Sequence, residues 1–193
     1  LPISNIIQPG DLDKLKVQTD FMGVNYYSDS FIGLPRDEDK PLIEEGLFPF
    51  PHRMNGSAPA PYTDMGWPVT PQGLEDLLLR IARDWPEIQD IAITENGAAY
   101  DEEPDSNGVV NDTRRVEYLE SHLAAAGRAI QKGAPLKSYY AWSLMDNFEW
   151  AEGYNKRFGL VHVDFKTLKR TIKNSGKAYS EVIAASSKAL ARN

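Results

Sequence analysis

Ile91 to Gly97 reads Ile-Ala-Ile-Thr-Glu-Asn-Gly, an apolar, β-branched run that stops at a carboxylate, an amide and a glycine. Such a run predicts a buried strand. Glu95 then stands where that strand opens to the C-terminal face of a β/α barrel, which is where barrel enzymes keep their catalytic groups. An isolated glutamate is more often structural, but this position favours a catalytic role. Gly97 is expected to let the backbone turn sharply, and Asn96 to add an amide at the rim.

A second strand candidate ends in similar chemistry. Tyr139 to Met145 reads Tyr-Tyr-Ala-Trp-Ser-Leu-Met and runs into Asp-Asn-Phe-Glu-Trp. Indole faces stack on the C–H faces of sugars, and a nearby carboxylate accepts hydrogen bonds from hydroxyl groups. Indoles are often core residues and a loop carboxylate is often merely solvated, yet the mixture of Trp142, Glu149 and Trp150 suits a polyol better than a hydrophobic ligand.

The composition bounds the class of protein. With 193 residues, 41% of them hydrophobic, the chain is expected to form a single domain spanning residues 1–193. Its 28 acidic and 21 basic residues give a formal charge of -7, and without a basic cluster nucleic acid is not an expected partner. The lack of cysteine excludes disulfides and thiolate catalysis and fits a cytoplasmic location. No apolar run approaches the roughly 20 residues of a membrane span.

Strand candidates separated by helical segments give the rhythm of a parallel β/α fold. The expected strands are Phe21 to Tyr27, Ile91 to Thr94 and Ser138 to Leu144. Between the first two lies the proline-rich stretch Pro35 to Pro61, which is far longer than an ordinary βα loop. Loops of this kind usually shape a site. After the third strand, Leu160 to Phe165 is expected to pair with Lys169 to Ile172 as a hairpin.

Helices are expected after each of these strands. The first has Thr70 as its N-cap and Pro71 at its first position. Its apolar stripe is Leu74, Leu77, Leu78 and Ile81. The second is capped by Asn111 or Asp112, and its apolar stripe is Val116, Leu119, Leu123, Ala126 and Ile130. The last runs from about Ser175 to Ala191.

These segments together resemble glycoside hydrolase family 1, the β-glucosidases and their relatives with a (β/α)8 barrel. Ile93 to Gly97 matches the segment that carries the catalytic nucleophile, and Gly23 to Tyr27 matches a strand that faces the sugar. Trp142 to Trp150, followed by Gly153 to Leu160, matches the closing signature of the family. The resemblance covers essentially the whole chain.

The resemblance implies a role for each of these strand ends. Glu95 would attack the anomeric carbon of the sugar, and Tyr27 would hydrogen-bond Glu95. Asn25 lies on the same strand face as Tyr27, because side chains alternate along a strand, and would also face the sugar. Without the resemblance, ordinary strand pairing would account for Asn25 and Tyr27 equally well.

The closing signature would line the sugar pocket. Trp142 would form its floor, Glu149 would hold the O4 and O6 hydroxyls, Trp150 would contact O3, and Phe158 would line the same pocket. Trp67 resembles the aromatic residue at the aglycone entrance. An acid at position 149 would repel a 6-phosphate, so a neutral sugar is expected.

The acid/base residue of this family has no counterpart here. It lies in an Asn-Glu-Pro segment, which the chain lacks, whereas retaining hydrolysis needs two carboxyl groups about 5 to 5.5 Å apart. With only three strand candidates and no initiating Met, the chain resembles an α/β piece of a TIM barrel, the C-terminal part comprising about strands 6 to 8. The start at Leu1 resembles an internal cut.

The function expected from this resemblance is that of a C-terminal fragment of a retaining β-glucosidase, which removes terminal glucose from cello-oligosaccharides or aryl glucosides. The fragment alone should be essentially inactive, and its expected partner is the N-terminal half of the enzyme or a second copy of the chain. No cofactor or metal is expected, because His52, His122 and His162 lack ligand spacing. The alternative is a non-catalytic sugar-binding or interaction protein, which would have no need of the nucleophile Glu95.

Overall fold

The structure, a computed structural model, describes residues 6–15, 17, 19–33, 52–53 and 61–190. Its central sheet consists of three strands in the order β1 (Met22–Asn25), β4 (Ile91–Asn96) and β5 (Leu136–Ala141). The middle strand, β4, runs parallel to both neighbours. Parallel strands with helical connections confirm the expected α/β class.

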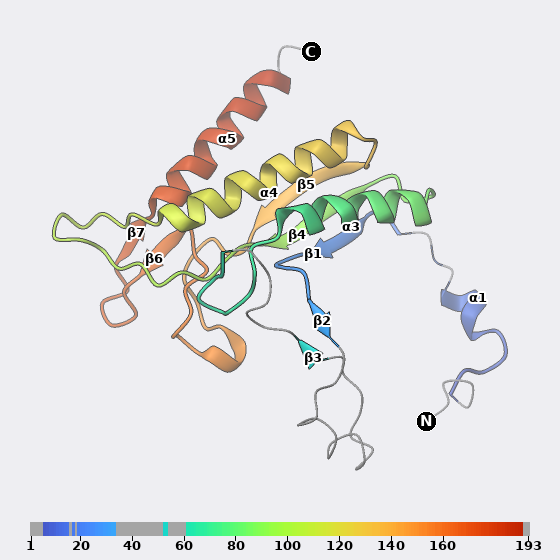
Figure 1. The fold of residues 1–193 in the computed structure, drawn as a ribbon, viewed down its shortest axis with the longest axis horizontal. Helices are drawn as coiled ribbons and strands as arrows, with labels where there is room; N and C mark the ends of the chain where they lie inside the picture. The colour runs from blue at the N-terminus through green and yellow to red at the C-terminus, as the bar shows by residue number, and fades with distance from the viewer. Residues whose placement is uncertain (1–5, 16, 18, 34–51, 54–60, 191–193) are drawn as a thin grey trace.

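The long helices follow the strands along the chain. They are α3 (Pro71–Asp84), α4 (Thr113–Gln131) and α5 (Asn174–Leu190). Figure 1 shows α3 and α4 side by side across one face of the sheet. The core between these helices and the sheet consists mainly of aliphatic residues: Val24, Leu74, Leu78, Ile81, Ile91, Ile93, Ala126, Ala129 and Leu136. Burying each large aliphatic side chain there contributes about 1.5 to 3 kcal/mol, so this layer holds the helices on the sheet.

The apolar stripe predicted for α3 is confirmed, with Leu77 only partly buried. The stripe predicted for α4 is partly wrong, because Ile130 is 50% exposed whereas Leu119 and Ala126 are buried. The buried face of α4 also includes alanines and three polar residues: Arg115, Tyr118, His122, Ala125 and Ala129. Apolar periodicity does not predict the burial of polar side chains, which depends on hydrogen-bond partners inside the protein.

Both ends of β5 differ from the predicted strand, which was Ser138 to Leu144. β5 begins at Leu136 and ends at Ala141, because the chain changes partner immediately afterwards. The backbone N–H of Trp142 still donates to the carbonyl oxygen of Asn96 at 2.9 Å, but that of Ser143 donates to Phe158 at 3.1 Å. The predicted hairpin is confirmed as β6 (Val161–Val163) antiparallel to β7 (Arg170–Ile172).

Shorter elements complete the described part of the chain. They are α1 (Asp11–Leu15), the antiparallel pair β2 (Ile32–Gly33) and β3 (His52–Arg53), and the single 3-10 turn η3 (Trp150–Glu152). Apart from β3 and Pro61, the predicted proline-rich loop 35–61 lies outside the described residues. Within the ranges that the structure describes, no helix is long and apolar enough to cross a membrane.

Asp112 joins two helices. It stands at the N-cap position of α4, as predicted, but its side chain makes no capping hydrogen bond to that helix. Instead its Oδ1 accepts the backbone N–H of Ser175 at 2.8 Å, and its Oδ2 forms an ion pair with Arg115 at 2.5 Å. The side chains of Asp112 and Arg115 are both buried. The carboxylate therefore fixes the start of α5 against the start of α4.

His122 is a buried histidine within this helix layer. Its ring stacks on that of Tyr118 with 3.9 Å between the ring centroids, and its Nδ1 lies 2.8 Å from the carbonyl oxygen of Tyr118. Burial lowers the pKa of His122 to about 4. His122 is therefore neutral at pH 7 and acts as a core residue.

Gly97 is required by close packing. A Cβ atom at this position would lie 1.9 Å from the carbonyl oxygen of Trp142. The backbone of Gly97 does not adopt a positive φ, so its conformation does not require a glycine. The glycine is needed because the ends of β4 and β5 approach each other too closely for any side chain.

We predict that Gly97→Ala destabilises the protein by about 1 to 3 kcal/mol, because the added methyl group must displace backbone. The matched control is Gly127→Ala in α4, where a Cβ would meet nothing within 4 Å. That change should stabilise the helix by about 0.5 to 1 kcal/mol. Urea denaturation of both variants checks the pair, and an unaltered midpoint for Gly97→Ala would contradict the packing argument.

Candidate active site

A one-residue bulge in β4 sets the directions of the side chains around Glu95. Val24 of β1 pairs with Ile93 of β4, but the next residue, Asn25, pairs with Glu95. Thr94 is therefore an extra residue between two consecutive pairs. A bulge of this kind redirects the side chains that follow it, and bulges are common next to active sites.

The bulge brings Thr94 and Glu95 to the same side of the sheet. The hydroxyl of Thr94 donates to Oδ1 of Asn25 at 2.6 Å, and the hydroxyl of Tyr27 donates to Oε2 of Glu95 at 2.6 Å. Asn25 and Tyr27 occupy alternate positions of one chain segment, so both face this side. The structure thus joins three of the predicted site residues, Asn25, Tyr27 and Glu95.

Two carboxylates act on Tyr27. Burial raises the pKa of Tyr27 well above its usual range, and the hydrogen bond to Glu95 and the negative charges of Glu95 and Glu149 raise it further. The hydroxyl therefore stays protonated and remains a donor to Glu95. The negative charge of Glu149, on the loop after β5, thus acts on the same hydroxyl as that of Glu95. Among the described residues neither acid forms an ion pair, which leaves Oε1 of Glu95 and the carboxylate of Glu149 available to further hydroxyl groups.

Aromatic rings from three separate segments meet beside Glu95. The ring centroid of Tyr27 lies 5.4 Å from that of Trp67 and 6.0 Å from that of Phe158, and the latter two lie 6.2 Å apart. Phe158 is buried, whereas Trp67 is half-buried. This cluster forms a rigid apolar wall next to the carboxylates.

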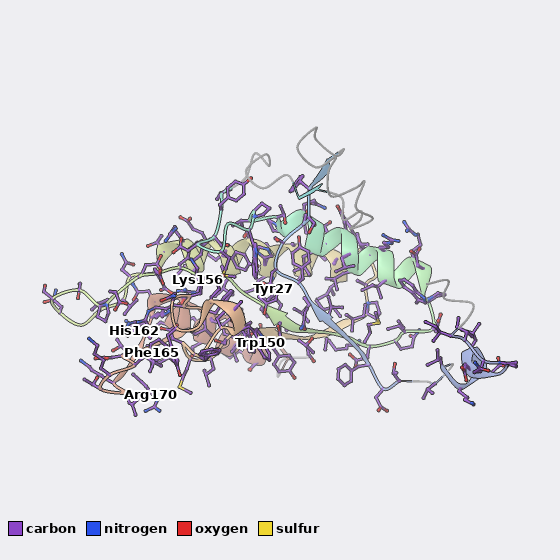
Figure 2. The ribbon with its side chains drawn as sticks, turned by 90° about the horizontal axis from the view of Figure 1, so that it is seen from below. Tyr27, Trp150, Lys156, His162, Phe165 and Arg170 are labelled. Carbon is purple, nitrogen blue, oxygen red and sulfur yellow. The ribbon has the colours of Figure 1, made fainter. Side chains whose placement is uncertain are left out.

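The loop after β5 carries the remaining predicted residues. Trp142 is half-buried, and the peptide bond between Trp142 and Ser143 is cis. Further along, the backbone N–H of Glu149 donates to Gly153 at 2.7 Å, and that of Gly153 donates back to Glu149 at 3.0 Å. Trp150 begins η3 at the surface and is 85% exposed (Figure 2). Trp150 thus lies apart from the aromatic wall, and no described residue covers its ring.

Asn96 is not at the rim, and that prediction is wrong. It is fully buried on the side of the sheet opposite to Glu95. Its Nδ2 donates to the carbonyl oxygen of Tyr26 at 2.8 Å and to the hydroxyl of Tyr118 at 3.1 Å, and its Oδ1 accepts from the hydroxyl of Tyr139. Sequence reasoning missed this support for the site. The only available signal was Tyr118, an aromatic residue with a polar tip on a predicted core helix.

A metal site was not expected, and the described ranges contain no group of three His, Cys, Asp or Glu residues able to hold an ion. The chemistry that this arrangement offers is that of two carboxylates, a protonated phenol and aromatic faces. Such a set can bind hydroxyl groups, stack on a ring, and supply a nucleophilic oxygen.

Comparison with known proteins identifies the family of the chain. Residues 3–188 match Glycosyl hydrolase family 1. β-Glucosidase A from Acetivibrio thermocellus is 49% identical over 173 residues, which cover 90% of this chain and 37% of that protein. A 6-phospho-β-galactosidase from Clostridium acetobutylicum is 39% identical, with 91% and 39% covered.

A solved structure also superimposes on most of the chain. The family 1 β-glucosidase from Thermotoga maritima matches with a TM-score of 0.79 and 40% identity, over 90% of this chain and 36% of that one. The chain therefore spans little more than a third of the length of such relatives. Both the family match and the shared fold lead to one assignment: the chain belongs to glycosyl hydrolase family 1.

Proposed function

We propose that this chain is the C-terminal part, about strands 6 to 8, of a (β/α)8 β-glucosidase that hydrolyses with retention of configuration. The observation that carries the proposal is Glu95 at the carboxyl end of β4, where it accepts the hydroxyl of Tyr27 at 2.6 Å. Carboxyl ends of barrel strands are where the active sites of this fold lie. The names of relatives such as β-glucosidase A support the same activity.

In this mechanism Glu95 attacks the anomeric carbon, the glycosidic C–O bond breaks, and a covalent glycosyl-enzyme forms. Tyr27 keeps its proton and orients the attacking carboxylate through its hydrogen bond. A second carboxyl group about 5 to 5.5 Å away protonates the leaving oxygen and later activates water. We propose that this group comes from the rest of the barrel, because the chain has no Asn-Glu-Pro segment.

The glycone would lie against the loop after β5. Trp142 would support the sugar ring, Trp150 would contact O3, and Glu149 would accept hydrogen bonds from the O4 and O6 hydroxyls. A negative charge at Glu149 also disfavours a 6-phosphate, because two like charges about 4 Å apart repel by about 1 kcal/mol in water and by more when shielded from it. We therefore propose a neutral β-glucoside or cello-oligosaccharide as substrate. Asn25 and Phe158 would line the same pocket, and Trp67 would contact the aglycone.

The partner we propose is the N-terminal part of the same enzyme. In the described sheet β1 and β5 are the outer strands, so each has one edge without a strand partner. Exposed aromatic residues flank both edges, with Phe21 52% and Tyr140 58% exposed. Pairing both edges with the missing strands would close the barrel and cover these rings. Self-association of the chain is the alternative way to cover them.

A non-catalytic sugar-binding protein is the rival function. The absence of an Asn-Glu-Pro segment favours it, since binding requires no general acid. The hydrogen bond between Tyr27 and Glu95 favours catalysis instead, because it orients one oxygen of an acid that sugar binding alone does not need.

A chimera tests the proposal. In it, this chain replaces the matched segment of β-glucosidase A from Acetivibrio thermocellus. We predict that the chimera hydrolyses aryl β-glucosides, that a Glu95→Gln chimera does not, and that the isolated chain shows a trace at most, since loss of a general acid costs about 10² to 10⁴ in rate. Initial-rate assays check all three. An inactive but folded chimera, or an isolated chain turning over at about 1 to 10³ per second, would contradict the proposal.

A second prediction concerns the sugar class. Glu149→Gln in the chimera keeps the volume but removes the charge, so kcat/KM for a neutral aryl glucoside should fall by about 10- to 100-fold, which corresponds to about 1.4 to 2.7 kcal/mol of transition-state contact. Relative activity on the 6-phosphorylated glucoside should rise. Glu152→Gln, an exposed acid on the same loop, is the matched control and should change neither rate. Unchanged selectivity in Glu149→Gln would remove Glu149 from the glycone site.

A further inference from the structure

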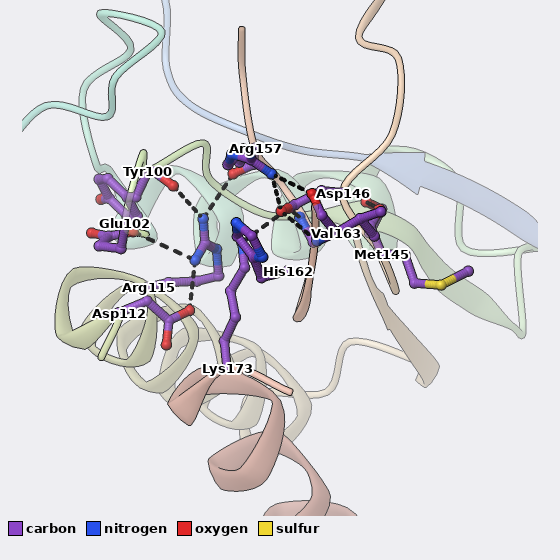
Figure 3. Close-up of polar contacts among 12 residues, drawn as sticks. Tyr100, Glu102, Asp112, Arg115, Met145, Asp146, Arg157, His162, Val163 and Lys173 are labelled. Atoms are coloured by element: carbon purple, nitrogen blue, oxygen red, sulfur yellow. Dashed lines mark hydrogen bonds and ion pairs between the residues drawn. The ribbon is translucent and has the colours of Figure 1, made fainter. Parts of the chain in front are cut away.

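Asp146 is a buried carboxylate at the start of the loop after β5, and it accepts hydrogen bonds from residues at and beyond the end of that loop (Figure 3). Its Oδ1 accepts the backbone N–H of Gly159 and the ammonium of Lys173, each at 2.9 Å. Its Oδ2 accepts the guanidinium of Arg157 at 2.9 Å and the backbone N–H of Val163 at 3.3 Å. The side chains of Asp146 and Lys173 are both 0% exposed.

These donors come from the returning arm of the loop and from the segment before α5. Asp146 itself lies on the outgoing arm, between Trp142 and Glu149. Its backbone N–H donates to the carbonyl oxygen of Val161 at 3.0 Å, and a Cβ on Gly159 would lie 2.1 Å from its backbone nitrogen. The two arms therefore touch at this point, and one carboxylate holds them there.

Stability alone is a poor reason for such a cluster. Burial lowers the pKa of Lys173, as does the positive charge of Arg115, while the carboxylates of Asp146 and Asp112 oppose that effect. Buried ion pairs lose nearly as much in desolvation as they gain in attraction, and apolar replacements of the same shape are often as stable. What the ions add is direction, since each hydrogen bond fixes one atom of the loop.

We propose that Asp146 is a positioning residue that sets glycone affinity by holding the loop with Trp142, Glu149 and Phe158 in place beside Glu95. The inference rests on the proposed function, because it assigns the loop to the sugar. Phe158 directly precedes Gly159, whose N–H binds the carboxylate, and Phe158 also contacts the ring of Tyr27 with 6.0 Å between centroids. Releasing the arms would therefore move one wall of the site.

Three variants separate positioning from stability. Asp146→Asn keeps the shape but leaves a single acceptor oxygen, so it releases donors on one side and leaves Lys173 as an unpaired buried cation. Lys173→Met removes that cation alone. The double variant Asp146→Asn with Lys173→Met removes both charges and should regain much of the stability lost by Asp146→Asn, while the loop contacts stay broken.

Three measurements are made on each variant. In the chimera, KM for an aryl glucoside should rise about 10-fold or more in Asp146→Asn and stay raised in the double variant, while kcat changes less. In the isolated chain, trypsin should cut after Lys156 or Arg157 about 10-fold faster in both, because cleavage follows local opening. Urea denaturation reports the stability of each protein, and Glu152→Gln should leave all values unchanged.

The outcomes are distinct. A double variant that regains KM and trypsin resistance together with stability would overturn the positioning role, as would Asp146→Asn with an unchanged KM. If the chimera binds and hydrolyses no glucoside at all, the proposed function fails, and the trypsin measurement still decides the role of Asp146 in the loop. Unchanged cleavage in Asp146→Asn would then overturn it.

Discussion

The extra residue in β4 is the constraint on which the rest of the site depends. A regular strand alternates its side chains, so Thr94 and Glu95 would face opposite sides of the sheet. The bulge turns both toward Asn25 and Tyr27, and it sends Asn96 into the layer between sheet and helices. The bulge thus directs the carboxylate of Glu95 to the face of the sheet away from the helices. The side chain of the next residue, Asn96, is hydrogen-bonded on the helix side of the sheet. Directly after the bulged strand, the backbone of Gly97 packs against the carbonyl group of Trp142 with no room for a side chain.

Next to the site, buried polar groups hold segments of the chain together, as apolar packing does between the helices and the sheet. Asp112 joins the starts of α4 and α5, and Asp146 joins the two arms of the loop after β5. Arg115 connects the two clusters, since its guanidinium binds both Asp112 and the carbonyl oxygen of Arg157 (Figure 3). Directional bonds suit this region because loops cannot be held by a layer of aliphatic side chains. The precision of the proposed glycone site would follow from these ions.

Much of this arrangement was predictable from local pattern. The apolar run before Glu95 predicted a strand end with a carboxylate, and the two-residue period placed Asn25 and Tyr27 on one face. The bulge was not predictable, because a two-residue period assumes that no residue is extra. Asn96 was expected at the rim because the strand was expected to end at Thr94, whereas β4 continues to Asn96. The buried face of α4 was misplaced for a related reason: Arg115 and His122 look like surface residues until their partners, which are distant in sequence, are known.

We propose that the chain supplies the nucleophile of a two-carboxylate site and that Glu95 forms the covalent bond. The direct measurement is the mass of the peptide containing Glu95 after the chimera has reacted with a 2-deoxy-2-fluoro β-glucoside. The fluorine slows breakdown of the intermediate, because it destabilises the oxocarbenium-like transition state of the second step. We predict that the fluoroglucosyl mass lies on Glu95. A label on Glu149 or on any other acid of the chain would contradict it.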